Sequence, residues 1–318
     1  MLTIFTIPKP FAGHSGLIQR NAIASWRRLT PLPEIILCGQ DAGVAETAAE
    51  FGVRHLPDIP CNAYGTPLLS AAFARVQALA AHPLICYANA DIIFLTDLPA
   101  ALSSIPFARF LLAGQRWDLD VTEPLDLAAG DPESRLRQEV AVRGRRHPPS
   151  GSDYFVFPRG SIRDLPEFAV GRIGWDNWLL YYARSLGMPV IDGSEAVTVI
   201  HQNHDYAHVA RRRNADSSDN PEGDRNLALM GGRAHVFLLA DATHRLTATG
   251  PVAALEDRYL MQRLGHLYVL APGRDLVTRL RRRALNWVGR HHRLLPDGVW
   301  RRLVYAGLAD RVKMEQRR

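Results

Sequence analysis

The chain has 318 residues, of which 47% are hydrophobic and 22% are charged, a composition typical of a folded globular protein. This length is sufficient for one large α/β domain that buries its own core without disulfides or structural metals. The sequence contains no run of about 18 uncharged apolar residues, which excludes a polytopic membrane protein.

The net charge of +6 is unevenly distributed along the chain. Residues 251–318 contain 15 Lys and Arg against 6 Asp and Glu, a balance of +9, so the first 250 residues carry −3. A basic segment on a mildly acidic body favours an acidic partner, either an anionic membrane surface or nucleic acid. Of the two, we expect the membrane surface rather than nucleic acid.

Short runs rich in Ile, Val and aromatic residues alternate with helical patterns in the first 100 residues. Strands are expected at 2–7, 34–38, 53–56 and 84–94. Helices are expected at 16–29, at 41–51 and from Thr66, with Thr66 as N-cap and Pro67 in the first turn. This alternation predicts a Rossmann-like half of parallel strands and crossover helices, with ligands at the carboxyl ends of the strands.

The second half has a different pattern. The charged stretch at 118–149 predicts a loop or a lid, and the polar residues 211–226 predict a flexible loop. Between them, a strand is expected at 153–158, a helix at 175–187 and two further strands at 188–192 and 196–200. We therefore predict an α/β fold with a mixed central sheet. It would comprise a catalytic domain at 1–250, a nucleotide-binding half at about 1–115, an acceptor half at about 150–210 and a basic helical extension at 251–318.

The three cysteines indicate the compartment. Cys38 and Cys86 lie in apolar runs, where cysteine acts as a small hydrophobe, and Cys61 leaves an odd number. The N-terminal run MLTIFTIPKPF is too short for the apolar segment of a secretion signal. We therefore expect a cytoplasmic protein, or one bound peripherally at the inner face of the membrane through its basic extension.

The run LICYANADIIF places two polar side chains, Asn89 and Asp91, in an otherwise apolar strand. Side chains two positions apart point to the same face of a strand. A buried carboxylate is costly unless it is paired or bound to a metal, so Asp91 is predicted to bind a divalent cation at the strand's carboxyl end. The alternative is a strand-end Asp that caps a turn.

Three histidines, His201, His204 and His208, follow the last predicted strand in the run HQNHDYAH. Neutral imidazole is a common metal ligand, and a histidine from a separate strand would complement Asp91 around Mn²⁺ or Mg²⁺. We expect His201 or His204 to reach the metal and His208 not to, because the first two lie nearest the strand end. The alternatives are a polar surface loop, or a zincin-like pair of His204 and His208 with Asp in place of that motif's Glu.

The segment GWDNW begins a predicted helix. Asp176 lies at the edge of its apolar stripe, which suits a catalytic base or a group that accepts a sugar hydroxyl. An Asp in the first turn also stabilises a helix by capping and through the dipole, so this alternative stays open. Trp175 could stack on a sugar, although its spacing is also typical of a core residue.

The three segments NAD, GWDNW and HQNHDYAH resemble GT-A glycosyltransferases, members of the nucleotide-diphospho-sugar transferase superfamily, over residues 1 to about 210. The segments GSDYFVFPRG and IGWDNWLLY resemble a bacterial-type branch of this family, and this resemblance does not indicate a substrate. The resemblance implies a GT-A fold and transfer of a sugar from a nucleotide-diphosphate sugar. Asn89 replaces an Asp of the family's metal motif, which predicts weak metal affinity in the absence of nucleotide.

The resemblance also implies roles for individual residues. Asp91 would bind the metal with His201 or His204, and Asp176 would be the catalytic carboxylate, with Asp153 behind it. The donor nucleotide sugar would contact Lys9, Arg20, Asn89 and Asp91, and the acceptor, a glycan or lipid-linked molecule, would contact Trp175 and Asn177. Two other functions stay open: a sugar-1-phosphate nucleotidyltransferase, and a non-catalytic protein whose basic extension binds nucleic acid or membrane.

Overall fold

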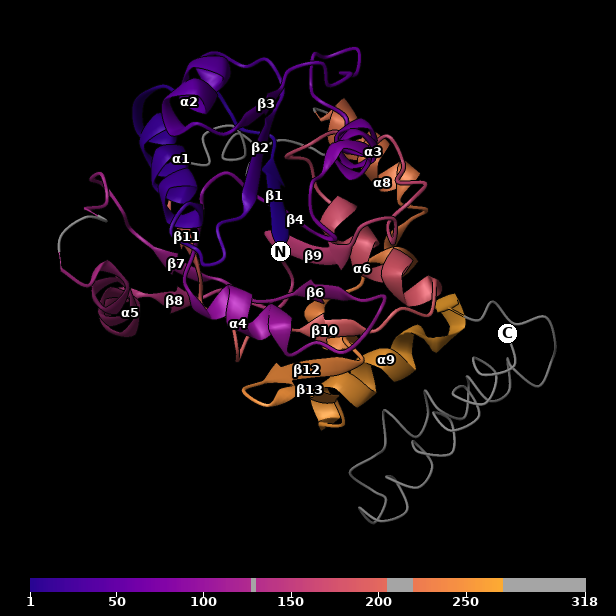
Figure 1. Cartoon of the computed structure of the whole chain (residues 1–318). Helices are drawn as coiled ribbons and strands as arrows, with labels where there is room; N and C mark the ends of the chain where they lie inside the picture. Colours follow the sequence, from indigo (N-terminus) through magenta and orange to yellow (C-terminus); the bar gives the residue numbers. More distant parts are fainter. Residues whose placement is uncertain (127–129, 205–219, 271–318) are drawn as a thin grey trace.

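The computed structural model describes residues 1–126, 130–204 and 220–270 (Figure 1). Within these residues the chain forms one large mixed sheet and one small sheet with helices around them, which confirms the predicted α/β class. Residues 271–318 of the predicted basic helical extension, and His208, lie outside the described residues. No helix in the described part is both long and apolar enough to span a bilayer.

The large sheet contains nine of the described strands, in the order β13-β12-β10-β6-β9-β4-β1-β2-β3. In chain order these are β1 Leu2–Thr6, β2 Glu34–Cys38, β3 Arg54–Leu56, β4 Leu84–Ala88, β6 Leu111–Ala113, β9 Tyr154–Pro158, β10 Val190–Asp192, β12 His244–Thr247 and β13 Gly250–Ala253. Strands β4, β1, β2 and β3 run parallel to one another, as predicted for a Rossmann-like half. Strand β9 runs antiparallel to β4 and β6, which makes the sheet mixed.

Helices cover both faces of the large sheet. Alternating residues of each strand point to opposite faces, and the apolar side chains of β1, β2 and β4 accordingly divide between two buried clusters. One cluster includes α3 Leu69–Leu79 and α6 Trp175–Ser185, and the other includes α1 Gly13–Trp26, α2 Val44–Phe51 and α4 Asp97–Ser103. The sheet is therefore the middle layer of an α/β/α arrangement.

The small sheet has the order β5-β11-β7-β8, with β5 Ile92–Phe94, β11 Val199–Gln202, β7 Trp117–Leu119 and β8 Arg145–Arg146. Strand β11 pairs antiparallel with β5 and parallel with β7. The apolar run at 84–94 is therefore two strands rather than one, and the turn between them carries the chain from the large sheet into the small one.

The prediction of a loop at 118–149 was wrong for about half of that stretch. It contains the end of β7, α5 Pro132–Arg143 and β8. Asp131 caps α5 by accepting from the Ser134 backbone N–H, and Leu136 and Val140 are buried against β7 and β11. Because only this narrow apolar stripe lies among many charged residues, the average composition of the stretch is that of a loop.

Two other boundaries differ from expectation. Helix α3 begins at Leu69 rather than near Thr66, because the Thr66 carbonyl accepts from the Asn62 backbone N–H and closes a turn that excludes it from the helix. At residues 220–226 of the predicted loop, the structure instead has the start of α8 Pro221–Leu229.

The large sheet continues past residue 250, where the catalytic domain was predicted to end. Strand β13 pairs with β12, and α9 Asp257–Leu270 follows it. Within α9, Tyr259 is buried and its hydroxyl donates to Asp192 over 2.7 Å. Strand β13 is therefore part of the large sheet, and α9 is joined to the end of β10 through Tyr259.

Candidate metal centre and substrate cleft

A cleft of about 470 Å³ opens at the carboxyl ends of β1 and β4. It is lined by residues from several separate segments: Ile7–Lys9 after β1, Asn89–Asp91 after β4, Arg116, Asp153, Val170–Arg172, His201 and His204. The parallel half of the sheet thus creates the edge where the sequence predicted a ligand, and the small sheet supplies the opposite wall.

The turn between β4 and β5 directs Asn89 and Asp91 into the cleft. The Asn89 backbone N–H donates to the Asp153 carbonyl over 2.9 Å, which ties the turn to the residue before β9. The Asn89 side chain also donates to Asp153 Oδ1 over 2.8 Å and accepts from the Tyr87 hydroxyl over 3.1 Å. Asn89 therefore fixes the turn as well as lining the cleft.

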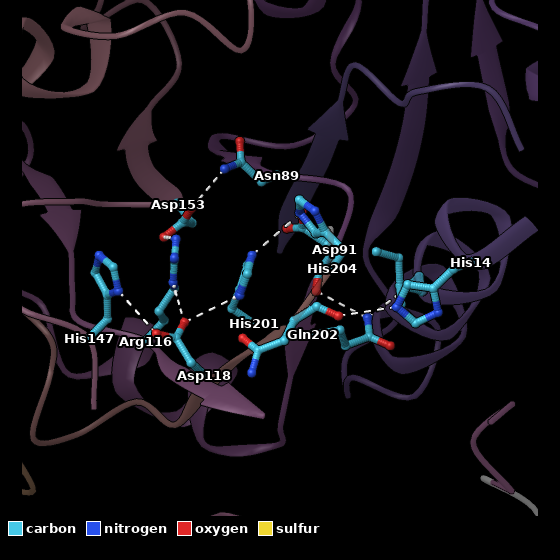
Figure 2. Close-up of polar contacts among 12 residues, drawn as sticks. His14, Asn89, Asp91, Arg116, Asp118, His147, Asp153, His201, Gln202 and His204 are labelled. Carbon is cyan, nitrogen blue, oxygen red and sulfur yellow. Dashed lines mark hydrogen bonds and ion pairs between the residues drawn. The ribbon is translucent and has the colours of Figure 1, made fainter. Parts of the chain in front are cut away.

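Three potential metal ligands meet beside this turn (Figure 2). His204 Nε2 lies 3.1 Å from Asp91 Oδ2, and His201 Nε2 lies 3.8 Å from the same oxygen. One ligand atom from each residue lies within 4.8 Å of the others. The pairing of β11 with β5 explains the arrangement, because it sets His201 opposite Ile92, the neighbour of Asp91.

The chemistry of these residues fits a divalent cation. Asp91 Oδ1 is buried and has no hydrogen-bond partner among the residues that the structure describes. Two imidazole nitrogens and one carboxylate oxygen form a donor set suited to Mn²⁺ and to other divalent transition metals. Three protein ligands also leave coordination positions for oxygen atoms of a substrate.

The charge of Asp91 is favoured by its surroundings. Burial alone would raise its pKa, but the hydrogen bond with His204 and the nearby charges of His201 and Lys9 hold the pKa of Asp91 below its usual value. The carboxylate is therefore ionised at neutral pH.

The side chain of Gln202 holds the backbone of the turn between β4 and β5. It is fully buried, and its side-chain Nε2 donates to the carbonyls of Asp91, over 3.0 Å, and Ile18, over 2.7 Å. Its Oε1 accepts from Asn21 Nδ2 over 3.0 Å. A single side chain thus connects α1, the end of β11 and the backbone of the metal-binding turn.

The sequence prediction missed Arg116 and Asp118, which extend the polar network behind the metal ligands. Asp118 Oδ1 lies 3.3 Å from His201 Nδ1 and accepts from Arg116 Nε over 2.8 Å. Arg116 in turn forms an ion pair with Asp153. Partial burial alone would raise the pKa of Asp118, but contacts with His201 and Arg116 hold that pKa well below its usual range.

A signal for these residues was present in the sequence. From Arg116 to Val121, charged residues alternate with Trp117, Leu119 and Val121, and the latter three contribute to a buried cluster with β11. Alternation with a period of two is typical of a half-buried strand. It indicates that Arg116 and Asp118 share the opposite face.

The two predicted catalytic carboxylates occupy different positions. Asp153 lines the cleft and is buried, with Arg116 and Asn89 as its partners. Asp176, in the first turn of α6, is not among the residues that line the cleft. Burial raises the pKa of Asp176 to about 6, and the negative charge of Asp153 contributes to the increase.

Of the other predicted substrate contacts, Lys9 lines the cleft and three residues do not. Arg20 forms an ion pair with Glu50 on the surface of α1 and α2. Trp175 is 5% exposed and packs edge-on against Tyr87 in the core. The Asn177 amide donates to the carbonyls of Ser150 and Phe237, so it holds loops together instead.

No protein-family model and no curated protein sequence matches the chain. Among solved structures, it is similar to glucosyl-3-phosphoglycerate synthase from Mycobacterium tuberculosis in complex with Mn²⁺, UDP and glucosyl-3-phosphoglycerate. The identity is 16% and the TM-score 0.43, over 73% of this chain and 80% of that one. The same enzyme with Mg²⁺ and UDP gives 16% identity and a TM-score of 0.39, over 68% and 81% of the two chains.

A candidate nucleotide-diphospho-sugar transferase from Desulfovibrio desulfuricans G20 is 12% identical, with a TM-score of 0.40 over 72% of this chain and 96% of that one.

Proposed function

We propose that the chain is a metal-assisted glycosyltransferase that moves a sugar from a nucleotide-diphosphate sugar to an acceptor. The observation that carries the proposal is the meeting of Asp91, His201 and His204 in a cleft at the carboxyl edge of the parallel strands, with one Asp91 oxygen buried and lacking a described partner. The resemblance of the NAD, GWDNW and HQNHDYAH segments to GT-A glycosyltransferases supports the same class.

Sugar transfer from such a donor requires stabilisation of the negative charge that develops on the departing diphosphate. A divalent ion held by Asp91, His201 and His204 would supply that stabilisation as a Lewis acid. Lys9 enters the same cleft from the loop after β1 and contributes to the electrostatic environment of Asp91. Its ammonium group would add a second positive charge beside the phosphates.

A neighbouring hollow supports a site for the nucleoside. It has a volume of about 380 Å³ and shares Asp41 with the main cleft. Its lining includes Gln40 after β2, His55 in β3 and Asp58 after β3. We assign the nucleoside to this hollow and the diphosphate to the metal centre, which leaves the side of Arg116 and Asp153 for the sugar and the acceptor.

Two carboxylates are candidates on the acceptor side, Asp153 in the cleft and Asp176 in the first turn of α6. Asp153 forms an ion pair with Arg116 and accepts a hydrogen bond from Asn89, which fixes its position and suits it to orient a hydroxyl group. Asp176 has a pKa of about 6, which suits proton transfer near neutral pH, and it would act on the acceptor only through a rearrangement at the start of α6.

The test is a screen of nucleotide-diphosphate sugars for turnover by the full chain, including slow hydrolysis without an acceptor. We expect turnover that EDTA abolishes and that Mn²⁺ or Mg²⁺ restores. The proposal fails if no nucleotide sugar is turned over, or if the chain instead forms a nucleotide sugar from a sugar 1-phosphate and a nucleoside triphosphate.

A further inference from the structure

His201 lies between two carboxylates. Its Nε2 faces Asp91 Oδ2 at 3.8 Å, and its Nδ1 faces Asp118 Oδ1 at 3.3 Å (Figure 2). The residue is 2% exposed, so its ring has little freedom to turn. The two ring nitrogens therefore face separate carboxylates, one at the cleft and one behind it.

The position of Asp118 follows from strand pairing. In the parallel pair of β7 and β11, Asp118 is the direct partner of His201. The carboxylate is also held from two other directions, by Arg116 Nε at 2.8 Å and by His147 Nδ1 at 3.1 Å. Backbone register and side-chain contacts thus fix the carboxylate behind the ring.

A neutral imidazole can bind a metal only through the nitrogen that carries no proton. A carboxylate beside Nδ1 favours the tautomer with the proton on Nδ1, which directs the Nε2 lone pair to the side of Asp91, where it could bind a cation. Such outer carboxylates also orient the ring and increase its basicity.

We propose that Asp118 is a positioning residue that holds His201 in its Nδ1–H tautomer and thereby sets the affinity of the site for its divalent ion. The inference rests on the metal site of the proposed function. Arg116 forms ion pairs with both Asp118 and Asp153. Asp118 is therefore connected through Arg116 to the proposed acceptor side of the cleft.

The first experiment measures the binding of Mn²⁺ alone to the full chain by electron paramagnetic resonance. Removing an outer partner of a metal-bound histidine commonly weakens metal binding by about 10- to 100-fold. We expect this increase in Kd for Asp118→Asn and Asp118→Ala. Asp118→Asn preserves the size of the side chain and carries the test if the alanine variant does not fold.

Asp97→Asn is the matched control. Asp97 is an arginine-paired carboxylate with a side-chain exposure of 20%, against 23% for Asp118, and it contacts Arg137 and Thr198 rather than the metal ligands. This variant should bind Mn²⁺ as the wild-type chain does. Equal weakening in both variants would mean that the loss of any partly buried ion pair disturbs the site, and would overturn the inference.

The second experiment reads the tautomer directly, by ¹⁵N nuclear magnetic resonance of the metal-free chain labelled at histidine, with His201→Gln to assign the signal. At a pH high enough to keep the imidazole neutral, we expect the Nδ1–H form in the wild-type chain and a mixture in Asp118→Asn. An Nε2–H form in the wild-type chain, an absence of Mn²⁺ binding to it, or an unchanged Kd in both Asp118 variants would overturn the inference.

The two proposals fail separately. If Mn²⁺ binding depends on Asp118 but no nucleotide sugar is turned over, the role of Asp118 stands and the proposed function fails. If sugar is transferred while the Asp118 variants keep wild-type metal affinity, the function stands and the role of Asp118 is wrong.

Discussion

The two carboxylate oxygens of Asp91 have different surroundings. Oδ2 faces the two histidines, and the buried Oδ1 lacks a hydrogen-bond partner in the described part of the chain. A buried acceptor without a partner is unfavourable, and a bound cation would remove this cost. Asp91 is therefore the residue at which a single substitution tests the metal site most directly.

Asp91→Asn should lower turnover of a nucleotide sugar by about 10²-fold or more, because a charged ligand is lost where the leaving group develops its charge. The fold should persist, since the Asp91 backbone keeps its contacts with Gln202. Steady-state kinetics and circular dichroism measure the two effects, with Asp97→Asn as the control. Activity near that of the wild-type chain would exclude Asp91 as a metal ligand.

Asp176 should make stability depend on pH. Its pKa is about 6 in the folded chain against 3.8 for an ordinary Asp, so between these values the folded state binds more protons than the unfolded state. Stability should fall as pH rises from about 4 to about 6, by up to about 3 kcal/mol at 1.36 kcal/mol for each pKa unit.

Asp176→Asn should flatten this dependence, as measured by urea unfolding at pH 4.5 and 7.5. Glu167→Gln is the control, because that side chain is 64% exposed and should contribute little to the slope. An unchanged slope in Asp176→Asn would show that the carboxyl group is not the one that titrates in this range.

The sequence indicated some residues of the site and missed others for a physical reason. Asp91 interrupts an apolar run and His201 follows one, so local pattern alone marks them. Asp118 reaches His201 through the pairing of β7 with β11, between residues 83 positions apart in the chain. Local pattern can indicate which side of a strand a residue faces, but it does not give the partner strand or the register.

At the scale of the elements, local periodicity predicted the strands of the parallel half well. Strand β2 has the expected bounds, and β1 and β3 differ by one residue at one end. The pattern failed at 84–94, where an apolar run continues through a turn, because residues in both β4 and β5 are buried. Two short buried strands in different sheets produce the same continuous apolar sequence as one long buried strand.

Trp26 links α1 to the strand that follows the metal-binding turn. It is fully buried, and its Nε1–H donates to the Ile92 carbonyl over 2.8 Å. Trp26→Phe should cost about 1–3 kcal/mol of unfolding free energy, because a buried acceptor loses its donor. Trp26→Ala should cost about 3–5 kcal/mol, because the ring is lost as well.

Urea unfolding of the two variants measures both effects. If Trp26→Phe is as stable as the wild-type chain, the hydrogen bond contributes nothing and the link between α1 and β5 is one of packing alone. The difference between the two variants gives the contribution of the remaining ring.

For the molecule as a whole, the metal ligands lie where the two sheets meet. Asp91 lies in the turn that leaves the large sheet, and His201 lies in the small sheet. A bound ion would therefore stabilise the contact between the sheets. At a Mn²⁺ concentration of ten times Kd, linkage gives about 1.4 kcal/mol, or a rise in Tm of about 2 °C for a chain of this length.

Differential scanning fluorimetry with and without Mn²⁺ measures this shift. It should disappear in Asp91→Asn and persist in Asp97→Asn. A rise in Tm of equal size in Asp91→Asn would place the ion elsewhere on the chain.

The membrane role of the basic extension stays a prediction of the sequence, because residues 271–318 of that extension lie outside the described part of the chain.

The contacts of Gln202 predict a pattern of covariation in related sequences. Its amide joins Asn21 on α1 to the backbone of the metal-binding turn, and all of these groups are buried. A change at either position alone would leave a buried donor or acceptor unsatisfied, at a cost of about 1–3 kcal/mol. Positions 21 and 202 should therefore covary among related chains, exchanging donor for acceptor together or becoming apolar together.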